Sequence, residues 1–139
     1  MLLLSPNLRR SIEISNLCDS ILSTEKILQV SFINRNGREI ETKSNESNES
    51  YRLTKQEFEM LSMQCTLQIS MNKEFDEKLT KVHYTVIKRE STCEFIFPIF
   101  EGIIFVVIDN TVDIQVACNR ILELIHKYES KTNNTQRIS

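Results

Sequence analysis

The sequence predicts an α+β fold with one five-stranded antiparallel sheet and helices on both faces, in the order α-β-β-α-β-β-β-α. Three segments with helical spacing of apolar residues lie at the start, middle and end of the chain. Five short segments rich in β-branched and apolar residues lie between them, and most are joined as hairpins. We therefore expect the middle helix on one face of the sheet and the terminal helices on the other. The length of 139 residues suits one domain, placed at residues 1–130, with a flexible polar tail at 131–139.

The first helix and the first hairpin have clear local signals. Ser5-Pro6 supplies an N-cap followed by a proline at the first helical position, and Ser23-Thr24 ends the apolar periodicity. Residues 27–33 and 38–42 form the next two expected strands. Asn36-Gly37 lies between them and predicts a tight type I′ turn, because both residues tolerate positive φ.

A polar segment separates this hairpin from the long middle helix. Residues 43–50 contain no apolar side chain, so we expect a solvated loop. Thr54 and Glu57 then have the spacing of a capping box. The helix that they begin is expected to cover residues 55–78.

This middle helix carries two apolar stripes instead of one. At about 100° per residue, one narrow sector contains Phe58, Leu61, Cys65 and Ile69. A broad sector on the opposite side contains Met60, Met63, Leu67, Met71 and Phe75. A helix lying on one sheet needs only one stripe. Either the first helix or another copy of the protein must cover the second stripe, and we favour an interface there over intrachain core.

Three strands and a helix complete the expected fold. The strands cover residues 82–88, 93–98 and 103–108, and the last of these is apolar on both faces, as expected at the centre of a sheet. Asn110 is expected to cap the last helix, with Asp113 in its first turn. The apolar residues of this helix form a single stripe: Ile114, Ala117, Cys118, Ile121, Leu124, Ile125 and Tyr128.

Composition and spacing argue against several kinds of site. Two glycines cannot build a glycine-rich phosphate loop, and a formal net charge of −2 gives no reason to expect nucleic acid. No apolar run is long enough for a transmembrane helix. The four cysteines lack the paired spacing of a zinc site, so we expect core residues. We predict no catalytic, cofactor-binding or metal-binding residues, although a nucleophile pair of Cys93 with His83 stays open on sequence alone.

Several short motifs are distributed over residues 17–128. They are Leu17-Cys18-Asp19-Ser20-Ile21-Leu22, Asn36-Gly37-Arg38, Glu59-Met60-Leu61-Ser62-Met63, Lys73-Glu74-Phe75-Asp76, Val82-His83-Tyr84, Phe97-Pro98 and Ile121-Leu122-Glu123-Leu124-Ile125. Over this range the chain resembles a family of short uncharacterised archaeal proteins, and the order of elements resembles the roadblock/LC7 group of small profilin-like domains.

The roadblock resemblance implies dimers built from the long middle helix and the following strand, with small GTPases as frequent partners. Together with the second stripe, it leads to our main hypothesis: a cytoplasmic, non-enzymatic, homodimeric scaffold or regulator that binds a regulatory protein and neither nucleic acid nor membrane. The alternative is a PAS-like or profilin-like sensor that holds a small apolar ligand between the sheet and a helix. Apolar positions on both faces of residues 103–108 allow that alternative.

Overall fold

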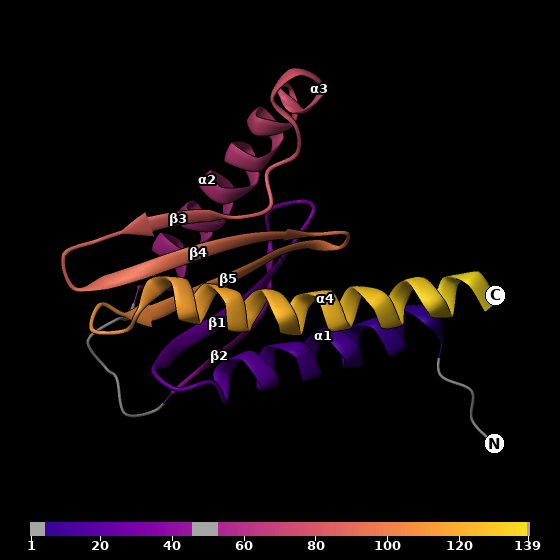
Figure 1. Cartoon of the computed structure of the whole chain (residues 1–139), viewed down its shortest axis with the longest axis horizontal. Coiled ribbons are helices and arrows are strands. Elements are labelled where there is room, and N and C mark those ends of the chain that lie inside the picture. Colours follow the sequence, from indigo (N-terminus) through magenta and orange to yellow (C-terminus); the bar gives the residue numbers. More distant parts are fainter. Residues whose placement is uncertain (1–4, 46–52, 139) are drawn as a thin grey trace.

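The computed structural model describes residues 5–45 and 53–138, with side chains as far as residue 132. Its elements follow the predicted order, with one additional short helix (Figure 1). In chain order they are α1 (Pro6–Leu22), β1 (Ile27–Asn34), β2 (Glu39–Ser44), α2 (Lys55–Lys73), α3 (Asp76–Leu79), β3 (Thr85–Lys88), β4 (Thr92–Ile99), β5 (Gly102–Asp109) and α4 (Ile114–Ile138).

The five strands form one antiparallel sheet in the order β2-β1-β5-β4-β3. Strand β5 lies at the centre, which explains why its residues 103–108 are apolar on both faces. Gly102 at its start pairs with Asn34 of β1. A Cβ atom on Gly102 would lie 2.1 Å from the carbonyl oxygen of Ile33, so this approach of two strands requires glycine.

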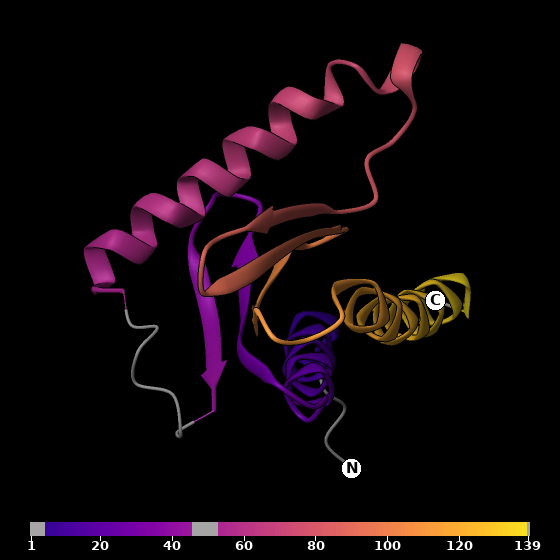
Figure 2. The ribbon, with the colours of Figure 1, turned by 60° about the vertical axis from the view of Figure 1, so that its left-hand side comes forward.

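Helices cover both faces of the sheet, as predicted (Figure 2). Helices α1 and α4 lie side by side on one face, and α2 crosses the other face obliquely. The last turns of α2 and the short α3 extend past the β3 edge of the sheet. The two faces therefore have separate cores.

The larger core lies between the sheet and the α1/α4 pair, and it includes the buried apolar residues Ile14, Leu17, Cys18, Ile21, Phe95, Phe97, Ile104, Cys118, Ile121 and Ile125. The smaller core lies under α2 and consists of Ile33, Phe58, Cys65, Ile96, Ile103, Phe105 and Val107. Every residue of 103–108 is buried in one core or the other.

The first hairpin is present, but its turn differs from the predicted type I′. Only Gly37 has a positive φ, of 81°, and Asn36 does not share it. The Asn34 N–H donates to the Arg38 carbonyl at 2.9 Å, which leaves three residues in the loop. The Asn34 side chain also accepts hydrogen bonds from the Asn36 and Arg38 N–H groups. These local bonds favour a three-residue loop ending in glycine over the two-residue turn.

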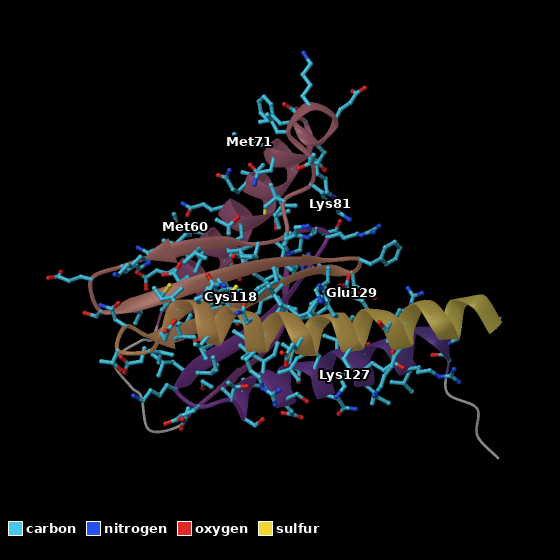
Figure 3. The ribbon with its side chains drawn as sticks, viewed as in Figure 1. Met60, Met71, Lys81, Cys118, Lys127 and Glu129 are labelled. Carbon is cyan, nitrogen blue, oxygen red and sulfur yellow. The ribbon has the colours of Figure 1, made fainter. Side chains whose placement is uncertain are left out.

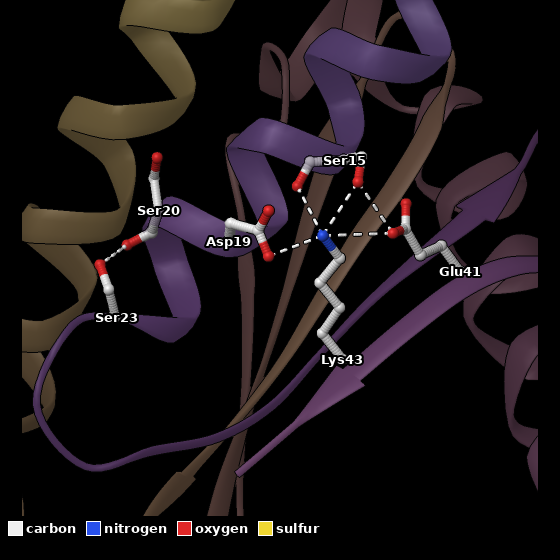
Figure 4. A network of polar contacts seen from close by, with 6 residues as sticks. All are labelled: Ser15, Asp19, Ser20, Ser23, Glu41 and Lys43. Atoms are coloured by element: carbon white, nitrogen blue, oxygen red, sulfur yellow. Dashed lines mark hydrogen bonds and ion pairs between the residues drawn. The ribbon is translucent and has the colours of Figure 1, made fainter.

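The expected loop at 43–50 is wrong at its start, because Lys43 and Ser44 belong to β2. Residues 46–50 lie outside the described part of the chain. The Lys43 ammonium reaches α1, where it donates to the Asp19 carboxylate at 2.6 Å and to the Ser15 hydroxyl at 2.9 Å (Figure 4). Glu41 on the same strand lies 3.3 Å from the Lys43 nitrogen and accepts from the Ser15 hydroxyl at 2.9 Å. This polar network fastens the edge strand to α1.

Three other boundaries differ from the predicted ones. Strand β3 begins at Thr85 instead of residue 82. Asp113, not Asn110, caps α4: its carboxylate accepts from the N–H groups of residues 115 and 116, whereas the Asn110 side chain donates to the carbonyl of Glu90. Helix α4 also continues through residues 131–138, where we expected a flexible tail.

Candidate interaction surface

The start of α2 follows from its capping box. The Thr54 hydroxyl accepts a hydrogen bond from the Glu57 N–H at 3.1 Å, and the Glu57 carboxylate accepts from the Thr54 N–H at 2.9 Å. Those hydrogen bonds hold the pKa of Glu57 below its usual value. The predicted capping box is confirmed, and it fixes where the helix begins.

The first stripe of α2 packs on the sheet. Phe58 and Cys65 are buried, and Leu61 and Ile69 pack partly buried against the same core. The Phe58 ring meets Phe105 of the central strand edge-on, with 6.1 Å between the ring centroids and an interplanar angle of 83°. Contacts of this kind are favourable for aromatic pairs. The interpretation of this stripe as the sheet-facing side is confirmed.

The second stripe is exposed to solvent. We call it the exposed stripe and define it by the five residues predicted from the sequence, which are between 48% and 59% exposed: Met60, Met63, Leu67, Met71 and Phe75. Figure 3 shows Met60 and Met71 along α2, on the side of the sheet away from α1 and α4. The first helix therefore does not cover this stripe.

The end of the exposed stripe differs from the prediction of a helix over 55–78. Helix α2 ends at Lys73, and Phe75 lies in the link to α3 with φ −102° and ψ 0°. Its N–H donates to the Asn72 carbonyl at 3.0 Å, which tightens the last turn. Phe75 is nevertheless exposed, and Leu79 beyond it is 72% exposed. Sequence reasoning missed Leu79, because spacing along one continuous helix does not describe a chain that bends.

Met63 also contacts its own chain. A Cβ atom placed on Gly37 would lie 2.7 Å from the Met63 sulfur and 3.2 Å from the Thr66 hydroxyl, so the β1–β2 turn presses against the middle of α2. A hollow of about 600 Å³ lies beside this contact. It is lined mainly by turn residues and charged side chains, namely Asn36, Gly37, Arg38, Glu39, Lys55, Glu59 and Met63.

The four cysteines are free and buried, as expected of core residues. Burial raises the pKa of Cys18 to about 12 and that of Cys65 to about 11, and it also raises the pKa of Cys93. His83 is exposed, whereas Cys93 is fully buried, so the structure gives no support to a nucleophile pair of the two. Within residues 5–45 and 53–138, no group of three acidic, histidine or cysteine side chains is placed to hold a metal ion.

None of the described helices combines the length and the apolar composition that crossing a bilayer requires.

A scan of family models assigns most of the chain to one family. Residues 10–133 match the model of a family of unknown function, DUF6659. The chain belongs to the DUF6659 family. A search of curated protein sequences found no match to this DUF6659 member.

Solved structures share the fold of this DUF6659 protein at low sequence identity. MglB of Myxococcus xanthus is 12% identical, with a TM-score of 0.66 over 90% of this chain and 96% of that one. A roadblock/LC7 domain from Streptomyces avermitilis is 11% identical, with a TM-score of 0.62 over 83% and 93%. MglC of Myxococcus xanthus is 12% identical, with a TM-score of 0.56 over 86% and 98%. The predicted roadblock-like fold is therefore confirmed.

Proposed function

We propose that this DUF6659 protein is a non-enzymatic interaction module that forms a homodimer through the exposed stripe of α2. In this proposal the dimer acts in the cytoplasm as a scaffold or regulator, and it binds a regulatory protein such as a small GTPase. The observation that carries the proposal is the exposed stripe itself. Five large apolar side chains, all about half exposed, follow one side of a single helix and its end. Contiguous exposed apolar surface of this kind is typical of protein interfaces.

The surroundings of the stripe support a second copy of this chain as the occupant. Among the described strands β3 pairs only with β4, so the backbone groups of its other edge are available to a further strand. Helices α2 and α3 lie above this same edge (Figure 1). A two-fold arrangement would bring α2 against α2 and β3 toward β3, and it would cover Leu79 as well. One solved structure that shares this fold, MglB with tetrameric arrangement, is an assembly of several chains, which supports self-association as the use of the exposed stripe.

The test is the mass of the particle in solution. The double substitution Met63→Glu with Leu67→Glu places two charges in the centre of the proposed interface. We expect wild-type protein to sediment as a dimer at tens of micromolar and the variant to sediment as a folded monomer. Burying an unpaired carboxylate costs several kcal/mol, so two of them in the interface of each copy should dissociate the dimer.

A matched control places the same charges elsewhere. Leu8 on α1 and Val116 on α4 are 48% and 64% exposed, so Leu8→Glu with Val116→Glu makes the same chemical change on the other face of the molecule. This control should sediment like wild type. A monomeric wild type, or a control that dissociates as fully as the test variant, contradicts the proposal.

The sensor alternative has less support. Both faces of residues 103–108 are filled by the two cores, so the sheet offers no empty apolar face. The hollow of about 600 Å³ lies at the β1–β2 turn and is lined largely by charged and polar side chains. A site for a small apolar ligand is expected to be mostly apolar.

A further inference from the structure

An exposed phenylalanine lies beside two arginines at the end of the sheet where the β1–β2 and β4–β5 turns are neighbours. Phe100 is in the β4–β5 turn and is 60% exposed. The guanidinium carbon of Arg35, from the β1–β2 turn, lies 4.3 Å from the centroid of this ring. That of Arg10, from α1, lies 5.8 Å from the same centroid. We call these three side chains the arginine–phenylalanine surface.

Three separate segments are needed to build this surface. The two turns are neighbours because Asn34 pairs with Gly102 where β1 and β5 meet. The N-terminal part of α1 lies at the same end of the molecule (Figure 1). Because residues 10, 35 and 100 are far apart in the sequence, only the folded chain brings the two cations onto one aromatic ring.

Local bonds hold the surface in place before any partner arrives. The Arg35 Nε donates to the Phe100 carbonyl at 2.7 Å, which ties the guanidinium group to the β4–β5 turn. The β1–β2 turn is itself closed by the Asn34 side chain, which accepts from the N–H groups of residues 36 and 38. A side chain that is already ordered loses less conformational entropy on binding.

The charged groups that a partner can reach here are the two guanidinium groups. The neighbouring acidic residue, Glu101, has both carboxylate oxygens buried, so a partner meets the arginines and not this carboxylate. Arginine forms paired hydrogen bonds with carboxylates, and an exposed aromatic ring offers an apolar contact next to them. Arginine and aromatic residues are also the types most enriched at the centres of protein interfaces.

We propose that the arginine–phenylalanine surface binds an acidic segment of a partner protein. In this complex, carboxylates of the segment bind Arg10 and Arg35, and an apolar side chain packs on Phe100. A peptide fits better than nucleic acid, because two arginines on a chain of net charge −2 do not make an extended basic face. The proposal rests on the proposed function only in treating the chain as an interaction module. It uses no residue of the exposed stripe and does not require the homodimer.

The test selects peptides without assuming a partner. A library of random linear peptides is panned on the wild-type chain and then depleted on a variant that combines Arg10→Gln, Arg35→Gln and Phe100→Ser. We expect the surviving peptides to be enriched in Asp and Glu beside an apolar residue. Fluorescence anisotropy with the best labelled peptide should then show about 10-fold weaker binding for Arg10→Gln and for Arg35→Gln, as expected when a charge-assisted hydrogen bond is lost.

Matched controls separate this effect from general charge and from unfolding. Arg120→Gln removes one exposed arginine from α4, and Val116→Ser removes an exposed apolar side chain from the same helix. Both should bind the peptide like wild type. Arg10→Gln breaks no hydrogen bond described for the folded chain, so its circular dichroism melting curve should match wild type.

Several results would overturn the proposal. They are an absence of surviving peptides, survivors without carboxylates, unchanged affinity in both arginine variants, or tighter binding of a single-stranded oligonucleotide than of any selected peptide. Failure of the homodimer would appear separately, in the sedimentation of the wild-type protein.

Discussion

The two faces of the sheet are built very differently. Nineteen buried apolar residues form the core under α1 and α4, whereas seven form the core under α2. Helix α4 buries most of its single apolar stripe, and α1 buries Ile14, Leu17, Cys18 and Ile21 against the same core. Helix α2 buries one stripe and exposes another of comparable length. The face with more burial supplies most of the stability, and the face with less burial carries the surface that is available for a partner.

Buried polar groups on the α2 side of the sheet add to this difference in apolar burial. The α2 side of the sheet includes the buried Ser31, whose hydroxyl lies 2.9 Å from that of Thr42. It also includes the fully buried Glu94, paired with Arg89. Arg89 is 54% exposed, so the pair mainly offsets the cost of burying the Glu94 carboxylate and adds little net stability compared with apolar packing. We infer that α2 is held to the sheet less firmly than α1 and α4 are, and the following predictions test that difference.

The largest effect is expected from a cavity on the α1/α4 side. Ile121 of α4 is fully buried there, and Ile121→Ala should lower the free energy of unfolding by about 2–5 kcal/mol. Val116→Ala removes apolar atoms from the same helix at an exposed position, and it should change stability by less than about 0.5 kcal/mol. Urea unfolding at one protein concentration measures both. Equal effects of the two substitutions would contradict the assignment of the main core to this face.

A second prediction compares the local opening of the two faces. Cys65 is on the sheet-facing side of α2, and Cys18 is on the sheet-facing side of α1 in the other core. Both thiols are buried with raised pKa values, so an alkylating reagent reacts only when the covering helix opens. We expect Cys65 to react at least about 10-fold faster in native buffer, because the smaller core opens at lower free energy. Iodoacetamide labelling followed by peptide mass spectrometry gives both rates.

The control for this comparison is the unfolded chain. In concentrated urea the two cysteines should react at similar rates, because no core then protects either. If Cys18 reacts as fast as Cys65 in native buffer, the two faces open together and α2 is not the weaker layer.

Much of this difference between the two faces could be predicted from the sequence, because it depends on the spacing of apolar residues along each helix. The two stripes of α2 and the single stripe of α4 are patterns of spacing that any straight helix must display. The capping box of Thr54 and Glu57 fixed where α2 begins. The spacing of apolar residues does not show where the chain bends after Lys73. The position of Phe75 outside α2 and the exposure of Leu79 were therefore missed.

The features that sequence reasoning did not find depend on contacts between distant segments. Lys43 was assigned to a solvated loop because its neighbours are polar, and only the folded chain places it beside Asp19. Arg10 and Arg35 are unremarkable in the sequence until the sheet brings both to Phe100. Local patterns carry no information on such pairings, because strand register and helix packing decide them.

The smallest predicted effect on stability concerns the edge of the α1/α4 layer. There the polar network of Lys43 borders the apolar core. Lys43→Met keeps the length of the side chain but removes its bonds to Asp19 and Ser15. We expect a loss of about 1 kcal/mol in the free energy of unfolding, because partly exposed ion pairs contribute little and the hydrogen bonds to Ser15 are also lost. Urea unfolding at neutral pH measures it.

The pH dependence of this effect has a definite sign. Burial lowers the pKa of Lys43, but the hydrogen bonds and charges of Asp19 and Glu41 outweigh it, so the pKa is raised above 10.5. A raised pKa in the folded state means that the stabilisation is complete below about pH 10 and is lost as the pH rises through the raised pKa. The difference between wild type and Lys43→Met should therefore be constant from about pH 7 to about pH 10 and shrink above that range. A difference that persists unchanged at about pH 12 would mean that packing of the side-chain stem, and not its charge, fastens β2 to α1.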